Sequence, residues 1–257
     1  KSGDTGYYVS NNRSPQTEVL TSFHNYLKTS LINGVCSLIN KDIKYLDLSI
    51  GRGGDIDKIL NEDNNVKFIL GLDVENINEA ARRYFVSRER KEDNTGIFLQ
   101  FDTSQKIKEF ASVKSSSKDD ITAAMLKVLY GTKPKKSRQD LWNNYKNKAK
   151  DGFDIVSSQF SLHYYLKDAT VFENFVSNVS DNTNVGGYFI STFYNGNKLF
   201  ELLKDKEGIS YTNKTDDKIY EIKKKYGIDN FEYDSEDTSN MFGNTISVYM
   251  DSIGQEI

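Results

Sequence analysis

The chain has 257 residues, with 34 lysines and arginines against 37 aspartates and glutamates, and a formal net charge of −3. Hydrophobic residues make up 37% and aromatic residues 12%, which is enough for a folded core and excludes a disordered chain. No apolar run approaches the roughly 20 residues of a membrane helix, and the single cysteine, Cys36, excludes an internal disulfide or a cysteine metal cluster. Length and composition predict one intracellular α/β domain, or one with a small appendage.

In chain order, residues 1–20 are polar and predict an extended lead-in segment, and a helix is expected from Ser22 behind a Thr21/Ser22 cap. Short apolar runs that alternate with helical patterns then predict a parallel, doubly wound sheet. The expected strands are residues 43–50, 66–74, 96–102, 153–160 and 186–192. After residue 195 we expect a helix, then a charged irregular stretch, and a late strand at 242–251.

The segment between the third and fourth expected strands, at about 103–152, is longer than a minimal fold of this type needs and predicts an insertion. It includes an expected helix at 121–131. Residues 131–150 carry seven lysines and arginines against one aspartate, a local charge of +6 in an acidic chain. Two interpretations stay open: a solvated surface insertion, or a basic patch that follows the phosphates of a nucleic acid.

The segment YLDLSIGRGGD (45–55) is typical of a strand that runs through a glycine turn into a helix. Such a turn needs residues that tolerate positive φ and leave the backbone open to a ligand. Asp55 stands where a pyrophosphate would need bare helix N–H groups, whereas S-adenosylmethionine has no phosphate and carries an ammonium and a sulfonium. Asp73, at the end of the second expected strand, suits a ribose diol. The residues therefore favour S-adenosylmethionine over a nicotinamide cofactor.

Several motifs, in order, resemble those of mRNA cap guanine-N7 methyltransferases, in particular the methyltransferase part of the multifunctional capping enzymes of large DNA viruses. These motifs are FHNYLK (23–28), DLSIGRGGD (47–55), LDVENINEAARRY (72–84), LQFDTS (99–104), FDIVSSQFSLHY (153–164) and VGGYFISTFYN (185–195). The resemblance spans roughly residues 20–200, and its specific part is the QFSLHY element combined with GRGGD.

The resemblance implies a class I S-adenosylmethionine-dependent methyltransferase fold over residues 21–257, a Rossmann-like, mostly parallel sheet flanked by helices. The implied reaction moves the methyl group of S-adenosylmethionine to N7 of the GpppN cap of mRNA and leaves S-adenosylhomocysteine. Guanine N7 has a lone pair at neutral pH, so this chemistry rests on proximity and orientation, and neither a general base nor a metal site is expected.

The resemblance also implies two groups of site residues. Those implied for the cofactor are Lys28 at the methionine carboxylate, Asp73 at the ribose, Asp102 near the adenine, Gln159 and Tyr164 at the methionine end, and Asp47, Ser49 and Gly51 in the turn. Those implied for the cap are Phe160 and His163 at the guanine, and Arg52, Lys58, Arg83 and, more loosely, His24 and Asn25 at the phosphates. Asp47 is expected to order the turn rather than to touch substrate.

The chain departs from the family pattern at three places. Ser49 stands where family members usually have a glycine, and the segment between Asp73 and the arginine pair that follows it is two residues shorter, so Arg82 competes with Arg83 for the cap. Family members complete the pocket with a glutamate and aromatic residues from a C-terminal segment. This sequence ends at GQEI, so we expect those final strands beyond residue 257 and do not assign Glu256 to the pocket.

The implied partners are capped RNA, triphosphatase and guanylyltransferase domains in the same polypeptide, and a stimulatory subunit, with no membrane. The implied location is the host cytoplasm or a virion. Two alternatives stay open. One is a catalytically silent methyltransferase-like domain that binds RNA or regulates a larger capping machine, and the other is methylation of a different RNA base or of a small molecule.

Overall fold

The computed structural model describes residues 14–75, 77–88, 93–112, 121–134, 138–227, 236 and 241–250. The chain divides into two compact units, which are described separately. The larger unit consists of Lys28–Tyr165 and Ala169–Phe193, and the smaller of Lys1–Leu27, Leu166–Asp168 and Tyr194–Ile257. Within the described ranges, no helix is both long and apolar enough to cross a bilayer.

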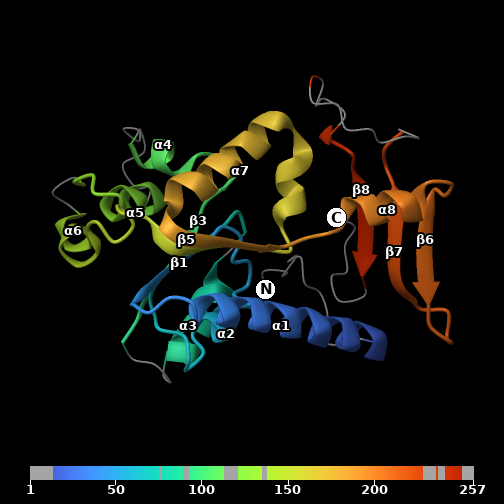
Figure 1. Cartoon of the computed structure of the whole chain (residues 1–257), viewed down its shortest axis with the longest axis horizontal. Coiled ribbons are helices and arrows are strands. Elements are labelled where there is room, and N and C mark those ends of the chain that lie inside the picture. Colours follow the sequence, from blue (N-terminus) through green and yellow to red (C-terminus); the bar gives the residue numbers. More distant parts are fainter. Residues whose placement is uncertain are drawn as a thin grey trace, which may run out of the picture. The chain divides into compact units, whose positions relative to one another are not determined.

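The larger unit is built on a five-stranded parallel sheet with the strand order β3-β2-β1-β4-β5 (Figure 1). Its strands are β1 (Ile43–Asp47), β2 (Val66–Asp73), β3 (Thr95–Gln100), β4 (Phe153–Gln159) and β5 (Thr183–Thr192). All five expected strands and their parallel arrangement are therefore confirmed. The chain moves outward from β1 to β3 and then returns to the other side of β1. Ligands of such sheets bind at this switch point, outside the carboxyl ends of the strands.

Helices cover both faces of this sheet, as the alternation of side chains along β1 shows. The helices of the larger unit are α1 (Pro15–Cys36, in part), α2 (Ile56–Ile59), α3 (Asn78–Arg88), α4 (Ile107–Ser112), α5 (Ile121–Leu129), α6 (Gln139–Tyr145) and α7 (Ala169–Asn182). Leu46 packs in a cluster with residues of α4, α5 and α7. Its neighbour Tyr45 packs in a second cluster with residues of α1, α2 and α3. Both faces are buried, as expected for a parallel sheet.

The first helix begins earlier than the sequence analysis predicts. It starts at Pro15, so the expected cap at Thr21/Ser22 was wrong, and the end of the expected lead-in is helical. Ser14 precedes it, and its Oγ accepts a hydrogen bond from Thr17 N at 3.2 Å. A serine cap followed by proline at the first helical position is a strong start signal, because proline lacks the N–H that would be unsatisfied there. Residues 1–13 of the lead-in lie outside the described residues.

The segment between β3 and β4 contains α4, α5 and α6. The expected helix at 121–131 is confirmed as α5. After β4 a 3-10 helix, η2 (Leu162–Lys167), begins, and α7 follows it directly.

The smaller unit contains α8 (Gly196–Leu203) and a separate antiparallel sheet of β6 (Gly208–Thr212), β7 (Lys218–Lys224) and β8 (Ile246–Met250). The expected helix after residue 195 and the expected late strand are confirmed. The prediction of an irregular stretch between them was wrong at β6 and β7. Isoleucine and tyrosine recur there among charged residues, and such residues favour strands once a neighbouring strand covers them. Strands beyond residue 257 stay a prediction.

Candidate functional site

The site lies where the segments that leave β1 and β4 meet. The backbone N–H of Leu48 donates to Ser157 O at 2.9 Å, which continues the pairing of the two strands. Just beyond, the Oγ atoms of Ser49 and Ser161 are 2.5 Å apart, and Ser161 Oγ lies 2.8 Å from Ser158 Oγ. This hydroxyl chain ties the glycine turn to the QFSLHY element across the switch point of the sheet. Ser49 therefore contributes a side-chain hydrogen bond to this junction.

Two glycines of the turn have different roles. Both have positive φ, +52° at Gly51 and +75° at Gly53. A Cβ on Gly53 would lie 2.6 Å from Ile56 Cδ1 and 2.8 Å from Ala80 Cα, so Gly53 lets α2 and α3 pack closely. A Cβ on Gly51 would have no described atom within 4 Å. The backbone at Gly51 therefore faces open space, as a ligand that approaches the turn requires.

Asp73 ends β2 and holds the turn in place. Its Oδ2 accepts a hydrogen bond from Gly51 N at 2.7 Å, and its Oδ1 accepts one from Glu75 N at 2.9 Å. Since a carboxylate has about four lone-pair positions, Asp73 keeps acceptor capacity for the hydroxyls of a ribose. The half-buried carboxylate thus both fixes the glycine turn and remains able to bind a diol beside it.

Asp47, at the end of β1, is buried, and its Oδ1 accepts a hydrogen bond from Ser49 N at 2.9 Å. Burial, together with the negative charges of Asp55 and Asp73, raises the pKa of Asp47 to about 8, against the lowering effects of the Ser49 hydrogen bond and of Lys28. The buried hydrogen bond supports the expected role of Asp47, to order the turn. Its implied place at the cofactor stays a prediction.

Lys28 and Lys58 converge on the same carboxylate. The Nζ of Lys28 lies 2.6 Å from Asp55 Oδ1, and the Nζ of Lys58 lies 3.0 Å from the same atom. Lys58 Nζ also donates to Gly54 O at 2.7 Å, and Lys28 Nζ lies 5.6 Å from the ring centroid of Phe160. All three charged side chains are at most 14% exposed.

Asp55 was not predicted as the partner of these lysines. The spacing of Asp55 and Lys58 offered a signal, because residues three apart are neighbours on a helix. Lys28 comes from α1, and no local spacing indicates its pairing. The cluster carries two positive charges and one negative charge, so it retains one positive charge at the turn for an anionic group. The implied roles of Lys28 at a carboxylate and Lys58 at phosphates stay predictions.

Gln159 is the last residue of β4, and its side chain is held within the sheet. Its Nε2 donates to Ser157 Oγ at 3.0 Å, and its Oε1 accepts from Thr192 Oγ1 at 2.9 Å. The side chain is buried, so the structure brings Gln159 to the expected edge with its amide engaged by neighbouring strands.

Aromatic residues follow directly. Phe160 has φ +54°, a left-handed conformation that is rare and strained for a residue with a bulky side chain. The rings of His163 and Tyr164 lie with their centroids 4.3 Å apart, and Tyr164 is 46% exposed. Burial lowers the pKa of His163 to about 4, so its imidazole is neutral at pH 7. A neutral imidazole beside an exposed aromatic ring can both stack on a base and hydrogen-bond to its edge.

Next to this cluster, Tyr165 anchors η2 to the end of β1. Its hydroxyl lies 2.6 Å from Thr103 Oγ1 and 3.3 Å from Leu48 O. No role was predicted for Thr103 or Tyr165. Asp102, expected near an adenine, is exposed, and its Oδ1 accepts a hydrogen bond from Ser104 N at 2.9 Å, which shapes the turn after β3.

The expected cap arginines lie on two segments. Arg52 is an exposed residue of the glycine turn. Arg82 and Arg83 both pair with Glu79: Arg82 Nε lies 2.8 Å from Oε2, and Arg83 Nε lies 2.9 Å from Oε1. Hydrogen bonds from Arg82 and Arg83 lower the pKa of Glu79 to about 2. Because Glu79 holds both arginines, the choice of Arg83 for the cap stays a prediction.

His24 and Asn25 lie on α1 and belong to the smaller unit, whereas the other expected residues belong to the larger unit. Glu256 lies outside the described residues. Among the residues that the structure describes, no group of three histidine, cysteine, aspartate or glutamate side chains could hold a metal ion.

Comparisons with known proteins show the family of this chain. The family model described as the mRNA (guanine-N(7))-methyltransferase domain matches residues 5–253. A probable mRNA-capping enzyme of Acanthamoeba polyphaga mimivirus is 29% identical over 217 residues, which is 80% of this chain and 17% of that protein. The mRNA cap guanine-N(7) methyltransferase of Caenorhabditis briggsae is 25% identical over 186 residues, 70% of this chain and 40% of that protein.

A solved structure of an S-adenosylmethionine-dependent methyltransferase from Clostridium acetobutylicum aligns with a TM-score of 0.49 and 15% identity, over 84% of this chain and 71% of that chain. The present chain spans less than half the length of the curated relatives it matches.

Proposed function

Because this chain belongs to the mRNA (guanine-N(7))-methyltransferase domain family, we propose that it transfers the methyl group of S-adenosylmethionine to N7 of the guanine cap of RNA. The observation that carries this proposal is the Ser49–Ser161 hydrogen bond of 2.5 Å. It joins the glycine turn, which suits a nucleoside-type cofactor, to the aromatic element, which suits a guanine base. Methyl transfer requires the two ligands to meet at such a junction.

The residues of the turn fit S-adenosylmethionine. The open space beside Gly51 leaves room for a ligand against the backbone, and the Asp73 carboxylate can accept hydrogen bonds from the ribose hydroxyls. Lys28 would hold the methionine carboxylate, with Gln159 and Tyr164 at the same end and Asp102 near the adenine. When bound, S-adenosylmethionine supplies a methyl group that its sulfonium has already activated.

The remaining chemistry requires the chain to position the two reactants, and it requires no proton transfer. Guanine N7 needs no base to remove a proton, and Asp47, whose pKa burial raises to about 8, is committed to the turn. His163 and Phe160 would hold the guanine, and Arg52, Lys58 and Arg83 would meet the triphosphate bridge. Such fixed groups lower the barrier by orienting the reactants and by stabilising charge as it develops.

Methyl transfer tests the proposal directly. The purified chain is incubated with radiolabelled S-adenosylmethionine and GpppG, and the methylated atom is identified; we expect N7-methylguanine and S-adenosylhomocysteine. Cofactor binding without any product would favour a silent, RNA-binding or regulatory domain. A product methylated at another atom, or only on another substrate, would favour a methyltransferase of a different RNA base or small molecule.

A matched pair of variants tests the assigned cofactor site. Asp73→Ala removes a charged acceptor of two hydrogen bonds, so we expect S-adenosylhomocysteine to bind about 100-fold more weakly in calorimetry. Glu75→Ala changes a neighbouring exposed carboxylate and should leave affinity within about twofold, because only its backbone N–H contacts Asp73. Equal losses in both variants would contradict the assignment of Asp73.

The proposed substrate is the GpppN end of capped RNA. The mimivirus relative is named as a probable mRNA-capping enzyme, and this chain spans 17% of its length. We therefore propose that triphosphatase and guanylyltransferase domains accompany this domain in one polypeptide, with a stimulatory subunit as a further partner. The proposed setting is the interior of a cell, in the host cytoplasm or a virion.

A further inference from the structure

The insertion between β3 and β4 supplies the lining residues of a pocket of about 210 Å³ in the larger unit. The pocket is lined by Lys108, Ala111, Tyr130, Thr132 and Lys150. Sites for drug-sized ligands are usually about 300–1,000 Å³, so this pocket suits a small group rather than a nucleoside or a whole cofactor. Its lining residues include two lysines, a tyrosine and a threonine beside one alanine, and such a basic, hydroxyl-bearing set suits an anion.

The backbone next to both lysines is anchored in the core. Lys150 follows Ala149, which is fully buried and donates its backbone N–H to Leu129 O at 3.0 Å. Lys108 follows Ile107, also fully buried, whose N–H donates to Asn178 Oδ1 at 2.8 Å. The lysines are therefore placed by tertiary structure at defined positions, even though they are far apart in the sequence.

The rear of the pocket is fixed as well. Tyr130 donates its hydroxyl hydrogen to Asn182 Oδ1 at 2.6 Å, and Asn182 in turn donates to Asn178 O at 2.7 Å. Burial raises the pKa of Tyr130 above its usual value, so this hydroxyl stays protonated and keeps its bond. Thr132 stands at the mouth, where it is exposed.

Neither lysine of the pocket forms an ion pair with a residue that the structure describes. This differs from Lys106 nearby, which pairs with Glu109, and from Lys28 and Lys58 in the glycine turn. The sequence around Lys150 adds to the positive potential, because residues 131–150 carry seven basic residues against one acidic residue. Two lysines without a described ion-pair partner, one of them in this basic stretch, favour a phosphate over a neutral ligand.

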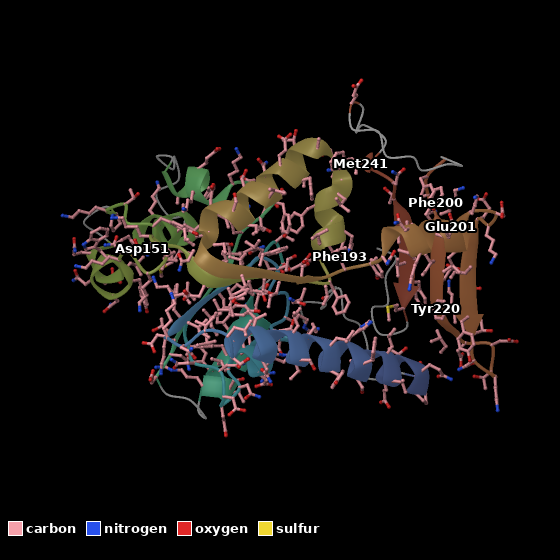
Figure 2. All side chains as sticks on the ribbon, viewed as in Figure 1. Asp151, Phe193, Phe200, Glu201, Tyr220 and Met241 are labelled. Carbon is pink, nitrogen blue, oxygen red and sulfur yellow. The ribbon has the colours of Figure 1, made fainter. Side chains whose placement is uncertain are left out.

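The pocket lies beside the amino ends of the parallel strands. The glycine turn lies at the opposite, carboxyl ends. Lys150 directly precedes β4, and Asn182, the partner of Tyr130, directly precedes β5. Figure 2 shows the two edges through Asp151, just before β4, and Phe193, just after β5, which lie at opposite ends of the sheet. A seven-residue strand such as β4 is about 23 Å long, which sets the scale of the separation.

We propose that this pocket binds a backbone phosphate of the RNA downstream of the cap. The proposal rests on the proposed function, because an RNA held by its cap at the carboxyl edge of the sheet reaches the pocket only if it runs along the unit. About 23 Å corresponds to about seven nucleotides at the 3.4 Å spacing of a stacked strand. The pocket thus distinguishes a capped RNA from a cap dinucleotide, and it anchors the RNA body without reading its sequence.

The test compares two double variants of the same charge. Lys108→Ala/Lys150→Ala removes both ammonium groups of the pocket, and Lys133→Ala/Lys146→Ala removes two exposed lysines of the basic segment that do not line it. Binding is measured by fluorescence anisotropy with a capped RNA of 20 nucleotides, and methylation is measured with the same RNA and with GpppG.

We expect the pocket variant to bind the 20-nucleotide RNA about tenfold more weakly, with a salt dependence shallower by about 0.7 for the lost phosphate contact. Methylation of GpppG should be unchanged, and the control variant should lose about twofold. Lys108→Arg/Lys150→Arg should restore binding, because it restores both charges. Capped RNAs shorter than about five nucleotides should not distinguish the pocket variant from the wild type.

Equal losses in the two double variants would overturn the pocket and leave a diffuse basic surface. A loss that is the same for GpppG and for the long RNA would place the lysines in cap binding, also against the proposal. If the pocket variant no longer binds inorganic phosphate but binds the long RNA as tightly as the wild type does, the ligand is a free phosphate and the RNA assignment is wrong. Since RNA binding is read without methylation, a chain that does not methylate GpppG refutes the proposed function alone.

Discussion

Lysines have opposite roles at the two ends of the parallel strands, which are called here the carboxyl edge and the amino edge of the five-stranded sheet. At the carboxyl edge, Lys28 and Lys58 are nearly buried and converge on Asp55. At the amino edge, Lys108 and Lys150 line a pocket and have no ion-pair partner among the described residues. A buried lysine needs a counter-charge because desolvation is costly, whereas a lysine in water does not. The first arrangement fixes geometry for a reaction, and the second keeps positive charge available to attract an anion.

The largest expected effect contrasts one glycine from each edge. Gly53 and Gly131 both have positive φ, +75° and +89°. A Cβ at Gly53 would meet the backbone Ala80 Cα at 2.8 Å, whereas at Gly131 it would meet the terminal Oδ1 of Asn147 at 2.6 Å. Gly53→Ala should lower the free energy of unfolding by about 3–5 kcal/mol, through backbone strain plus overpacking. Gly131→Ala should cost only about 1–2 kcal/mol, because a side chain can move aside.

Urea denaturation of both variants measures this difference. Equal destabilisation would show that the glycine turn is no more tightly packed than the insertion, and the contrast between a rigid edge and an adaptable edge would fail.

A smaller effect is expected at the aromatic element of the carboxyl edge. His163→Ala should reduce kcat/KM for cap methylation by about 10- to 100-fold, since base stacking contributes about 1–3 kcal/mol. The affinity for S-adenosylhomocysteine, measured by calorimetry, should change less than twofold. If cofactor affinity falls in step with activity, His163 belongs to the cofactor site instead of the cap site.

The pH dependence of this step sharpens the same assignment. Because burial lowers the pKa of His163 to about 4, the imidazole is neutral throughout pH 6–8, and its protonation should not alter kcat/KM there. The lowered pKa of His163 in the folded state also means that its contribution destabilises the fold as pH falls from about 6.5 towards 4. His163→Gln should remove that contribution in thermal unfolding at acidic pH.

A second pH dependence concerns Asp47. Since burial raises its pKa in the folded state to about 8, the folded chain holds a proton that the unfolded chain releases above pH 4. Stability from Asp47 is therefore present in full below pH 4 and declines by at most about 1.4 kcal/mol per pH unit until pH 8. Asp47→Asn keeps an acceptor for Ser49 N and should flatten this decline. Parallel pH–stability curves of wild type and Asp47→Asn would contradict the raised pKa.

The strands of the parallel sheet could be predicted from the sequence because a strand that is buried on both faces is a nearly continuous run of apolar residues. β2 and β4 are almost entirely buried, and both were predicted within two residues of their ends. β6 and β7 were missed, because their alternating tyrosines, isoleucines and lysines resemble a charged loop until a third strand pairs with them. The start of α1 was missed although Ser14 and Pro15 carried a local signal.

For the site, the sequence by itself determined which residues follow each strand. The parallel order then brings Asp47, Asp73 and Gln159 to one edge, because the carboxyl ends of parallel strands meet there. Pairings between distant segments were decided only by the tertiary structure. Asp55 takes Lys28 from a separate helix, and Lys108 and Lys150, from distant parts of the insertion, line one pocket. No spacing along the sequence indicates such contacts, because they depend on how helices pack against the sheet and not on the periodicity of a single helix or strand.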